Sequence, residues 1–137
     1  MLQVELVSPE KILFSGPASF VRARTVGGGE IAFLTGHAPF IGALETSSVK
    51  IITDDGTELF VAVHGGFVEV SDDTVTILSD VAELAGDIDA GRAEDARTRA
   101  EADLRTDPDD EEAQAALKRA EIRIEVASAT PATSARH

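Results

Sequence analysis

The stretch SDVAELAGDIDAGRA, residues 79–93, separates two parts of the chain that differ in composition. All six phenylalanines and nine of the eleven glycines precede Leu84. After Leu84 there is no phenylalanine, tyrosine or tryptophan, and alanine becomes the main apolar residue. This change of pattern indicates a strand-rich body that is followed by helices. The sequence therefore predicts an α+β fold with a boundary close to residue 84.

The first part contains short apolar or alternating runs with turn residues between them. These runs predict strands at residues 2–7, 11–14, 18–25, 30–34, 40–44, 48–53, 58–64, 66–71 and 74–79. Many short strands without intervening helices are typical of an antiparallel sandwich or barrel. The run 58–64 is apolar on both faces, so it needs a second cover besides the sandwich core. The helical tail and a partner protein are the two alternatives for that cover.

The second part is predicted to form an antiparallel helical hairpin. Asp87 or Asp89 is suited to cap a first helix over 90–104, and Asp107, followed by Pro108, is suited to begin a second. The predicted apolar stripes are Ala93, Ala96, Ala100 and Leu104 in the first helix and Ala113, Ala116, Leu117, Ala120, Ile124 and Ala127 in the second. An alanine methyl buries little apolar area, so the hairpin should leave its docking surface at a cost of only about a few kcal/mol.

Composition and charge exclude several classes of function. The chain has no cysteine, and its three histidines lie far apart in the sequence, so disulfides, thiolate chemistry and a local zinc motif are not expected. The formal net charge of −13 opposes binding to nucleic acid or to an anionic membrane surface. The start resembles no signal peptide and no run is long enough to span a membrane, so we expect a cytoplasmic protein. Acidity then either favours a protein partner or only keeps the chain soluble.

Three local motifs resemble parts of catalytic or binding sites. The stretch TVGGGE, residues 25–30, lacks the lysine and following helix of a phosphate loop, and is better interpreted as a turn. The triplet His64-Gly65-Gly66 has no nucleophile motif to accompany it, and predicts a close crossing of two backbones. His37 lies in a loop, where a structural or interface role is favoured. A small β-sandwich enzyme therefore has the least support.

Four arginines of the hairpin are spaced so that each pair shares a helix face. Arg92 and Arg99 are seven residues apart on the first helix, and Arg119 and Arg123 are four apart on the second. Folding of the hairpin could bring the four guanidinium groups around an anion such as a polyphosphate. The alternative is that each arginine pairs with a nearby acidic residue on its own helix.

Four segments occur together in an order and spacing that resemble a known family. They are GEIAFLTGHAPF at 29–40, GGFVEVS at 65–71, VTIL at 75–78 and IDAGRA at 88–93. Together they resemble the epsilon subunit of bacterial F-type ATP synthase, over residues 2–127. The resemblance implies a sandwich of about ten strands over 1–84 and a regulatory helical hairpin over 85–127. Residues 128–137 are expected to form a disordered tail.

The resemblance also implies a function. It implies a non-catalytic rotor subunit that couples proton translocation to ATP synthesis and inhibits ATP hydrolysis through the mobile hairpin. The implied partners are the gamma subunit, the c ring and the alpha/beta catalytic head, with no nucleic acid and no direct insertion into the membrane. The implied location is the cytoplasmic face of the bacterial membrane, as a peripheral protein. No cofactor is required, and ATP is a possible regulatory ligand.

The resemblance carries two sets of site residues onto this sequence. Facing the c ring or gamma it places Glu30, Gly36, His37, Ala38, Pro39 and Phe40. Around a regulatory ATP it places Glu83, Ile88, Asp89, Arg92, Ala93, Arg99, Arg119 and Arg123. A free-standing nucleotide sensor is the competing hypothesis, which rests on the same four arginines.

Overall fold

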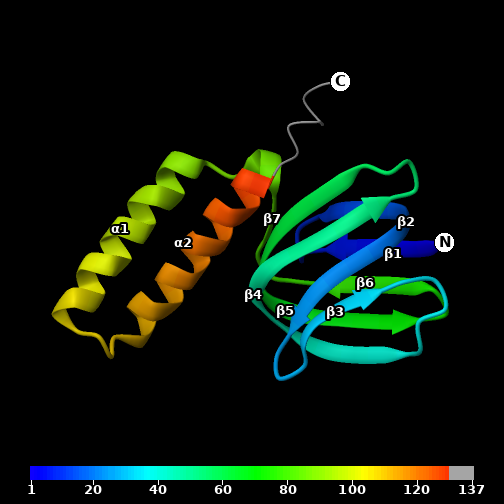
Figure 1. Cartoon of the computed structure of the whole chain (residues 1–137), viewed down its shortest axis with the longest axis horizontal. Coiled ribbons are helices and arrows are strands. Elements are labelled where there is room, and N and C mark those ends of the chain that lie inside the picture. The colour runs from blue at the N-terminus through cyan, green and yellow to red at the C-terminus, as the bar shows by residue number, and fades with distance from the viewer. Residues whose placement is uncertain (130–137) are drawn as a thin grey trace.

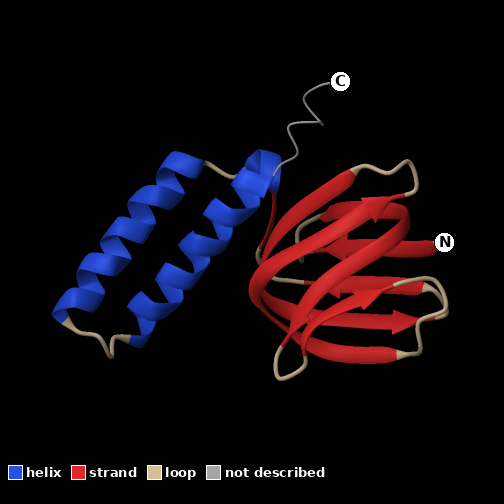
Figure 2. Ribbon diagram, viewed as in Figure 1, coloured by secondary structure: helices blue, strands red, loops and turns tan. Residues whose placement is uncertain are grey.

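The computed structural model describes residues 1–129, which form a strand-built body and a helical hairpin beside it (Figures 1 and 2). The strands are β1 (Leu2–Val7), β2 (Ile12–Thr25), β3 (Gly29–Phe33), β4 (Phe40–Thr53), β5 (Glu58–Ser71), β6 (Thr74–Leu78) and β7 (Ala82–Leu84). The helices are the short 3₁₀ helix η1 (Ala85–Asp87), α1 (Ala90–Thr106) and α2 (Glu111–Ala129). The predicted change from strands to helices at residue 84 is confirmed.

The strands form one sheet that closes on itself. Its order is β1-β6-β5-β4-β2-β3, and β1 also pairs with β2, which joins the two sides of the sheet. β1 and β6 are parallel, and the other pairings are antiparallel. Every second side chain points into the enclosed space. The largest fully buried side chains there are Phe33, Leu2, Leu6, Ile51 and Ile77. The core of the body contains no residue beyond Leu84 among those the structure describes.

The expectation of about ten strands is wrong in number, since the described sheet has seven. In three places, two consecutive predicted strands form a single continuous strand of 14 residues. These strands are β2, β4 and β5. These strands bend from one side of the sheet to the other without breaking, with register shifts in β2 at its pairing with β4. The short polar or glycine segments that predicted turns lie within these continuous strands.

The hairpin packs on the sheet through α2, whereas α1 lies on the outer side of α2 (Figure 1). Ile122 and Val126 of α2 form an apolar cluster with Ala62 of β5, and Phe60 packs against this cluster. The second cover of strand β5 is therefore the helical tail, one of the two predicted alternatives. Neither helix of the described residues is long and apolar enough to cross a membrane.

The helix ends differ from the prediction in three places, the first being that α1 continues to Thr106, past the predicted end at 104. Asp89 caps α1 as predicted, because its side chain accepts a hydrogen bond from the Arg92 N–H at 3.0 Å. Asp107 does not cap α2; its carboxylate accepts from the Asp109 N–H within the turn between the helices. Asp110 caps α2 instead, accepting from the Ala113 N–H at 3.0 Å. α2 continues to Ala129, past the predicted end at 127, and the rest of the predicted disordered tail lies outside the described residues.

Candidate functional site

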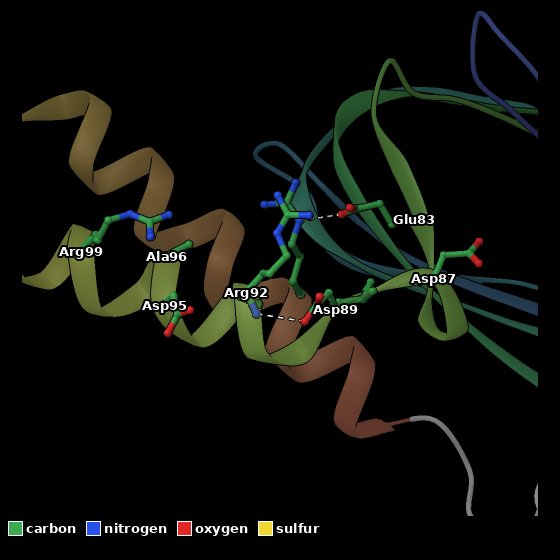
Figure 3. Close-up of a pocket in the computed structure, with 10 residues that line it drawn as sticks. Glu83, Asp87, Asp89, Arg92, Asp95, Ala96 and Arg99 are labelled. Atoms are coloured by element: carbon green, nitrogen blue, oxygen red, sulfur yellow. Dashed lines mark hydrogen bonds and ion pairs between the residues drawn. The ribbon is translucent and has the colours of Figure 1, made fainter.

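A cleft of about 570 Å³ lies where the hairpin leaves the sandwich, and we name it the hinge cleft (Figure 3). Its lining residues are Glu83, Asp87, Ile88, Asp89, Arg92, Ala93, Asp95, Ala96, Arg99 and Arg123. They come from β7, from the segment around η1, from the first half of α1 and from one residue of α2. The hinge cleft therefore joins the two parts of the molecule.

The start of α1 is fixed by its own sequence. Asp89 has an extended backbone, and its carboxylate satisfies an N–H group at the start of the helix. Ile88 packs against the apolar cluster of Ala62, Ile122 and Val126, which ties the segment before α1 to the sandwich. Arg92 follows within the first turn of the helix, so its side chain extends from a well-anchored position toward the cleft (Figure 3).

Arg92 and Arg99 have free guanidinium groups. Across residues 1–129 neither group has an acidic partner within ion-pair distance, although acidic residues are abundant on α1. Arg97 of the same helix, by contrast, pairs with Glu94 at 2.6 Å. Figure 3 shows Arg92 and Arg99 extending to the same side of α1. Two unpaired guanidinium groups on one side of a cleft provide donors for an anion.

Glu83 is the central acceptor of the site. Its Oε1 accepts from Arg123 Nε at 2.8 Å and from His64 Nε2 at 2.9 Å. Burial alone would raise the pKa of Glu83, but the hydrogen bonds from His64 and Arg123 outweigh burial and hold the pKa below its ordinary value. Glu83 is therefore ionised at neutral pH. Its carboxylate links β5, β7 and α2 in one contact.

The charges of the hinge cleft are nearly balanced. Four carboxylates line it, from Glu83, Asp87, Asp89 and Asp95, together with three guanidinium groups. One guanidinium is already used by Glu83, so the two free ones are those of Arg92 and Arg99. The arrangement is suited to a ligand that combines an anionic group with hydrogen-bond donors, because carboxylates can accept from such donors.

The structure places most of the residues expected around a nucleotide in this cleft. Seven of the eight line it, and the exception is Arg119, whose guanidinium instead pairs with Glu112 at 2.9 Å. Sequence reasoning did not name Asp87, Asp95 and Ala96 as lining residues, nor His64 as a partner of Glu83. His64 could have been found, because it lies on the same strand face as Phe60 and Ala62, which needed a second cover.

The residues expected to face the c ring lie at two ends of β3. Glu30 lies at the start of the strand, where its carboxylate contacts Arg24 at 3.3 Å and Arg22 at 4.0 Å. The segment 36–40 follows the other end, about 10 Å farther along the strand. Glu30 and this segment therefore do not form one contiguous cluster.

The segment 36–40 is held by an aromatic cluster and a hydrogen bond between loops. The His37 ring meets Phe33 edge to face at a centroid distance of 4.9 Å and also contacts Phe40. Its Nδ1–H donates to the Ala38 carbonyl at 2.7 Å. The Gly36 N–H donates to the Asp73 carboxylate at 2.7 Å. This loop is thus a fixed surface, built on a fully buried phenylalanine.

Comparison with protein families accounts for both parts of the chain. Residues 1–85 match the family described as ATP synthase, delta/epsilon chain, β-sandwich domain. Residues 87–128 match the family described as ATP synthase, delta/epsilon chain, long α-helix domain. The chain belongs to the ATP synthase delta/epsilon chain family. A member of this family is a non-catalytic subunit of the ATP synthase, so the hinge cleft is a candidate binding site and not an active site.

Similar proteins from bacteria support the assignment to the epsilon side of the family. The "ATP synthase epsilon chain" of Streptomyces avermitilis is 41% identical over 128 residues, which cover 93% of this chain and 96% of that protein. The protein of the same name from Bordetella petrii is 41% identical over 137 residues, with 98% and 94% covered. That of Brevibacillus brevis is 48% identical over 100 residues, with 73% and 75% covered.

Two solved structures share the fold at low sequence identity. A chain of the Euglena gracilis mitochondrial ATP synthase is 24% identical and superimposes with a TM-score of 0.70, over 99% of this chain and 81% of that one. A chain of the Tetrahymena thermophila mitochondrial enzyme is 18% identical, with a TM-score of 0.52 and coverage of 95% and 96%. The arrangement of a delta/epsilon sandwich and helical hairpin is therefore shared well beyond bacteria.

Proposed function

We propose that this chain is a rotor subunit of a bacterial F-type ATP synthase, and that its sandwich couples proton-driven rotation to ATP synthesis. The hairpin is a brake that inhibits ATP hydrolysis when it leaves the sandwich. The names of the relatives support the assignment to the stalk, and the Tetrahymena chain is from a central stalk and c ring assembly. The observation that carries the brake is the small contact between α2 and the sandwich.

The sandwich has an apolar belt that is suited to the gamma subunit. Ile12, Val7, Leu78 and Phe67 are successive partners across β2, β1, β6 and β5. Ile12, Leu78 and Phe67 are each more than half exposed, which is unusual for adjacent large apolar side chains. We assign gamma to this belt, since the resemblance makes gamma the partner that stays with the sandwich during rotation.

The loop 36–40 is proposed to face the c ring. It presents Leu34, Ala38 and Pro39, which are exposed, above the aromatic cluster of Phe33, His37 and Phe40. A rigid apolar loop with few charges can rest on the polar loops of another protein without burying an unpaired charge. Glu30, at the other end of β3 and paired with Arg24, is proposed to contact the c ring or gamma separately from this loop. The catalytic head is the proposed partner of the extended hairpin.

The contact that holds the hairpin down is limited. Its fully buried part is the cluster of Ala62, Ile122 and Val126, and α2 also lies along β4. Phe60, Ala85 and Ile88 pack against this cluster, and Arg123 forms an ion pair with Glu83. Full burial of one valine or isoleucine side chain contributes about 1.5–3 kcal/mol, so two such side chains and a half-buried ion pair give a hold of a few kcal/mol. A partner or a ligand can supply free energy of this size.

Truncation is expected to release the brake. An ATP synthase rebuilt with residues 1–84 of this chain should hydrolyse ATP several-fold faster than one rebuilt with the full chain, at equal amounts of bound subunit. Residues 1–84 contain the whole core of the sandwich, so binding to the rotor is retained. ATP synthesis by the two complexes in proton-loaded vesicles is the control. Equal rates of hydrolysis would contradict inhibition and leave the coupling role intact.

We further propose that ATP binds in the hinge cleft and holds the hairpin down. The free guanidinium groups of Arg92 and Arg99 contact the phosphates, and the acidic residues of the cleft accept from the base and ribose. Because the lining comes from both β7 and the hairpin, a ligand bound there stabilises the docked state and disfavours the extended one. ATP would then be a regulatory ligand and not a cofactor that the fold requires.

Calorimetric titration of the full chain with ATP tests this site. Arg92→Ala should weaken ATP binding about 10- to 100-fold, since a charged hydrogen bond contributes about 1.5–3 kcal/mol. Arg105→Ala, which is exposed on the same helix outside the cleft, should leave binding unchanged. Equal losses in both variants, or no binding by the original chain, would remove ATP from the proposal.

A further inference from the structure

Three elements meet at one oxygen of Glu83, and only one of them belongs to the hairpin. His64 extends from β5, Glu83 from β7 and Arg123 from α2. In the part of the chain that the structure describes, the pair of Arg123 with Glu83 is the only ion pair between α2 and the sandwich. The protonation of His64 therefore affects the ion pair of Arg123 with Glu83, which helps to hold the hairpin on the sandwich.

The hydrogen bond to Glu83 fixes which ring nitrogen of neutral His64 carries the hydrogen. The Glu83 carboxylate can only accept, so His64 Nε2 carries a hydrogen and donates it. The His64 side chain is only 5% exposed, and within residues 1–129 its Nδ1 is buried without a hydrogen-bond partner. A proton added at Nδ1 would create a buried donor with no acceptor.

We propose that His64 makes the docking of the hairpin sensitive to pH, because the docked hairpin requires the neutral imidazole and acidification favours its release. This inference rests on the proposed mobility of the hairpin and is independent of ATP binding. The pH would then be a further signal that regulates inhibition by the hairpin. At acidic pH the hairpin is released and can inhibit ATP hydrolysis.

The charges around His64 act in opposite directions. Burial and the positive charges of Arg123 and Arg119 on α2 lower the pKa of His64, whereas Glu83 on β7 raises it, and the sum is a lowered pKa. On β4, the residue directly opposite is Thr46, which carries no charge. Release of α2 takes both arginines away, so the pKa of His64 should rise toward its ordinary value of about 6.5.

The direction of the pH effect follows from these shifts. A group with a lower pKa in the docked state binds fewer protons there, so docking is fully stabilised above pH about 6.5 and weakens as the pH falls below it. For a single proton the docking equilibrium can change by at most about tenfold per pH unit. Between pH 7.5 and 5.5 we therefore expect a several-fold fall in the ratio of docked to released hairpin, with a ceiling of about tenfold.

Energy transfer between two dyes on the full chain can measure this ratio. The chain has no cysteine, so Ala32→Cys on β3 and Ala102→Cys on α1, both exposed positions, give two unique labelling sites. His64→Gln keeps an N–H donor for Glu83 and cannot titrate, so its docked-to-released ratio should stay constant from pH 7.5 to 5.5. His37→Gln is the matched control and should follow the original chain.

The outcomes separate this inference from the proposed function. If the ratio stays constant in the original chain, or if His64→Gln retains the same pH response, the role of His64 is overturned while the mobile hairpin stands. If even Val126→Asp fails to release the hairpin, the proposed brake fails as well. Should His64→Gln release the hairpin at every pH, an NMR titration of His64 decides: its pKa should be higher in Val126→Asp than in the original chain, and equal values would overturn the inference.

Discussion

Gly66→Ala is expected to destabilise the whole sandwich more than any other substitution of a glycine in this chain. Gly66 has a φ of +123°, and a Cβ added there would clash with the carbonyl oxygen of Leu78 and lie 3.0 Å from the Cα of Ser79. Both obstacles are backbone, so no side chain can move away. Backbone strain and overpacking each cost about 1–3 kcal/mol, and we expect a loss of about 3 kcal/mol or more in urea unfolding.

Two other glycines provide controls for this substitution. Gly65 also has a positive φ, of +88°, but the nearest atom to an added Cβ is 3.9 Å away, so Gly65→Ala should cost only about 1 kcal/mol of strain. Gly86→Ala meets nothing within 4 Å and should change the free energy of unfolding by less than about 0.5 kcal/mol. Equal urea midpoints for the three variants would contradict the close crossing at Gly66.

The crossing at Gly66 also positions the candidate site. The Ser79 hydroxyl, next to the crossing, shares its one hydrogen between the Gly65 carbonyl at 2.7 Å and the Val81 carbonyl at 3.0 Å. These bonds attach the segment that leads into β7 to strand β5. Glu83 is thereby placed beside His64. The glycine pair Gly65-Gly66 allows the two backbones to cross closely and does not form part of an oxyanion hole.

The sequence was sufficient to predict strands and their faces but not their continuity. Glycine and polar residues near 15–17, 45–47 and 65 are typical of turns, so the sequence predicts that strands end there. In a closed sheet a long strand must bend to pass from one side to the other, and the same residues permit such a bend. Local sequence does not distinguish a bend from a turn, because the difference lies in the strands that pair on both sides.

The hairpin shows a similar limit. The predicted stripe of α2 correctly included Ala113 and Ala120, which are buried, but omitted Ile122 and Val126, which are also buried. A helix that packs between α1 and a sheet buries two faces, and a single apolar stripe describes only one of them. The larger side chains of the second face are those that contact the sandwich.

The candidate site could be predicted from the family motif more completely than from spacing. Spacing alone left two alternatives, convergence of the four arginines or pairing of each with an acidic residue on its own helix. Three of the arginines line the hinge cleft, whereas Arg119 pairs with Glu112 on its own helix. Which arginines find acidic partners depends on side-chain packing between α1, α2 and β7. The pattern of charges along one helix contains no information about that packing.

Val126→Asp is expected to release the hairpin while the sandwich stays folded. Val126 is fully buried in the small cluster with Ala62 and Ile122. The substitution removes about 1.5–3 kcal/mol of apolar burial and places an unpaired carboxylate in the contact, which adds several kcal/mol more. A hold of a few kcal/mol cannot offset this, so the ratio of docked to released hairpin should fall at least about 100-fold.

Energy transfer between the dyes on residues 32 and 102 measures the release, and urea unfolding measures the sandwich. Ala115→Asp adds the same charge at an exposed position of α2 and should leave the hairpin docked. The sandwich of Val126→Asp should keep its own transition, because its core contains no described residue of α2. If Val126→Asp unfolded the sandwich together with the hairpin, the two would fold as one unit. A hairpin that leaves the sandwich only when the sandwich unfolds could not serve as a brake.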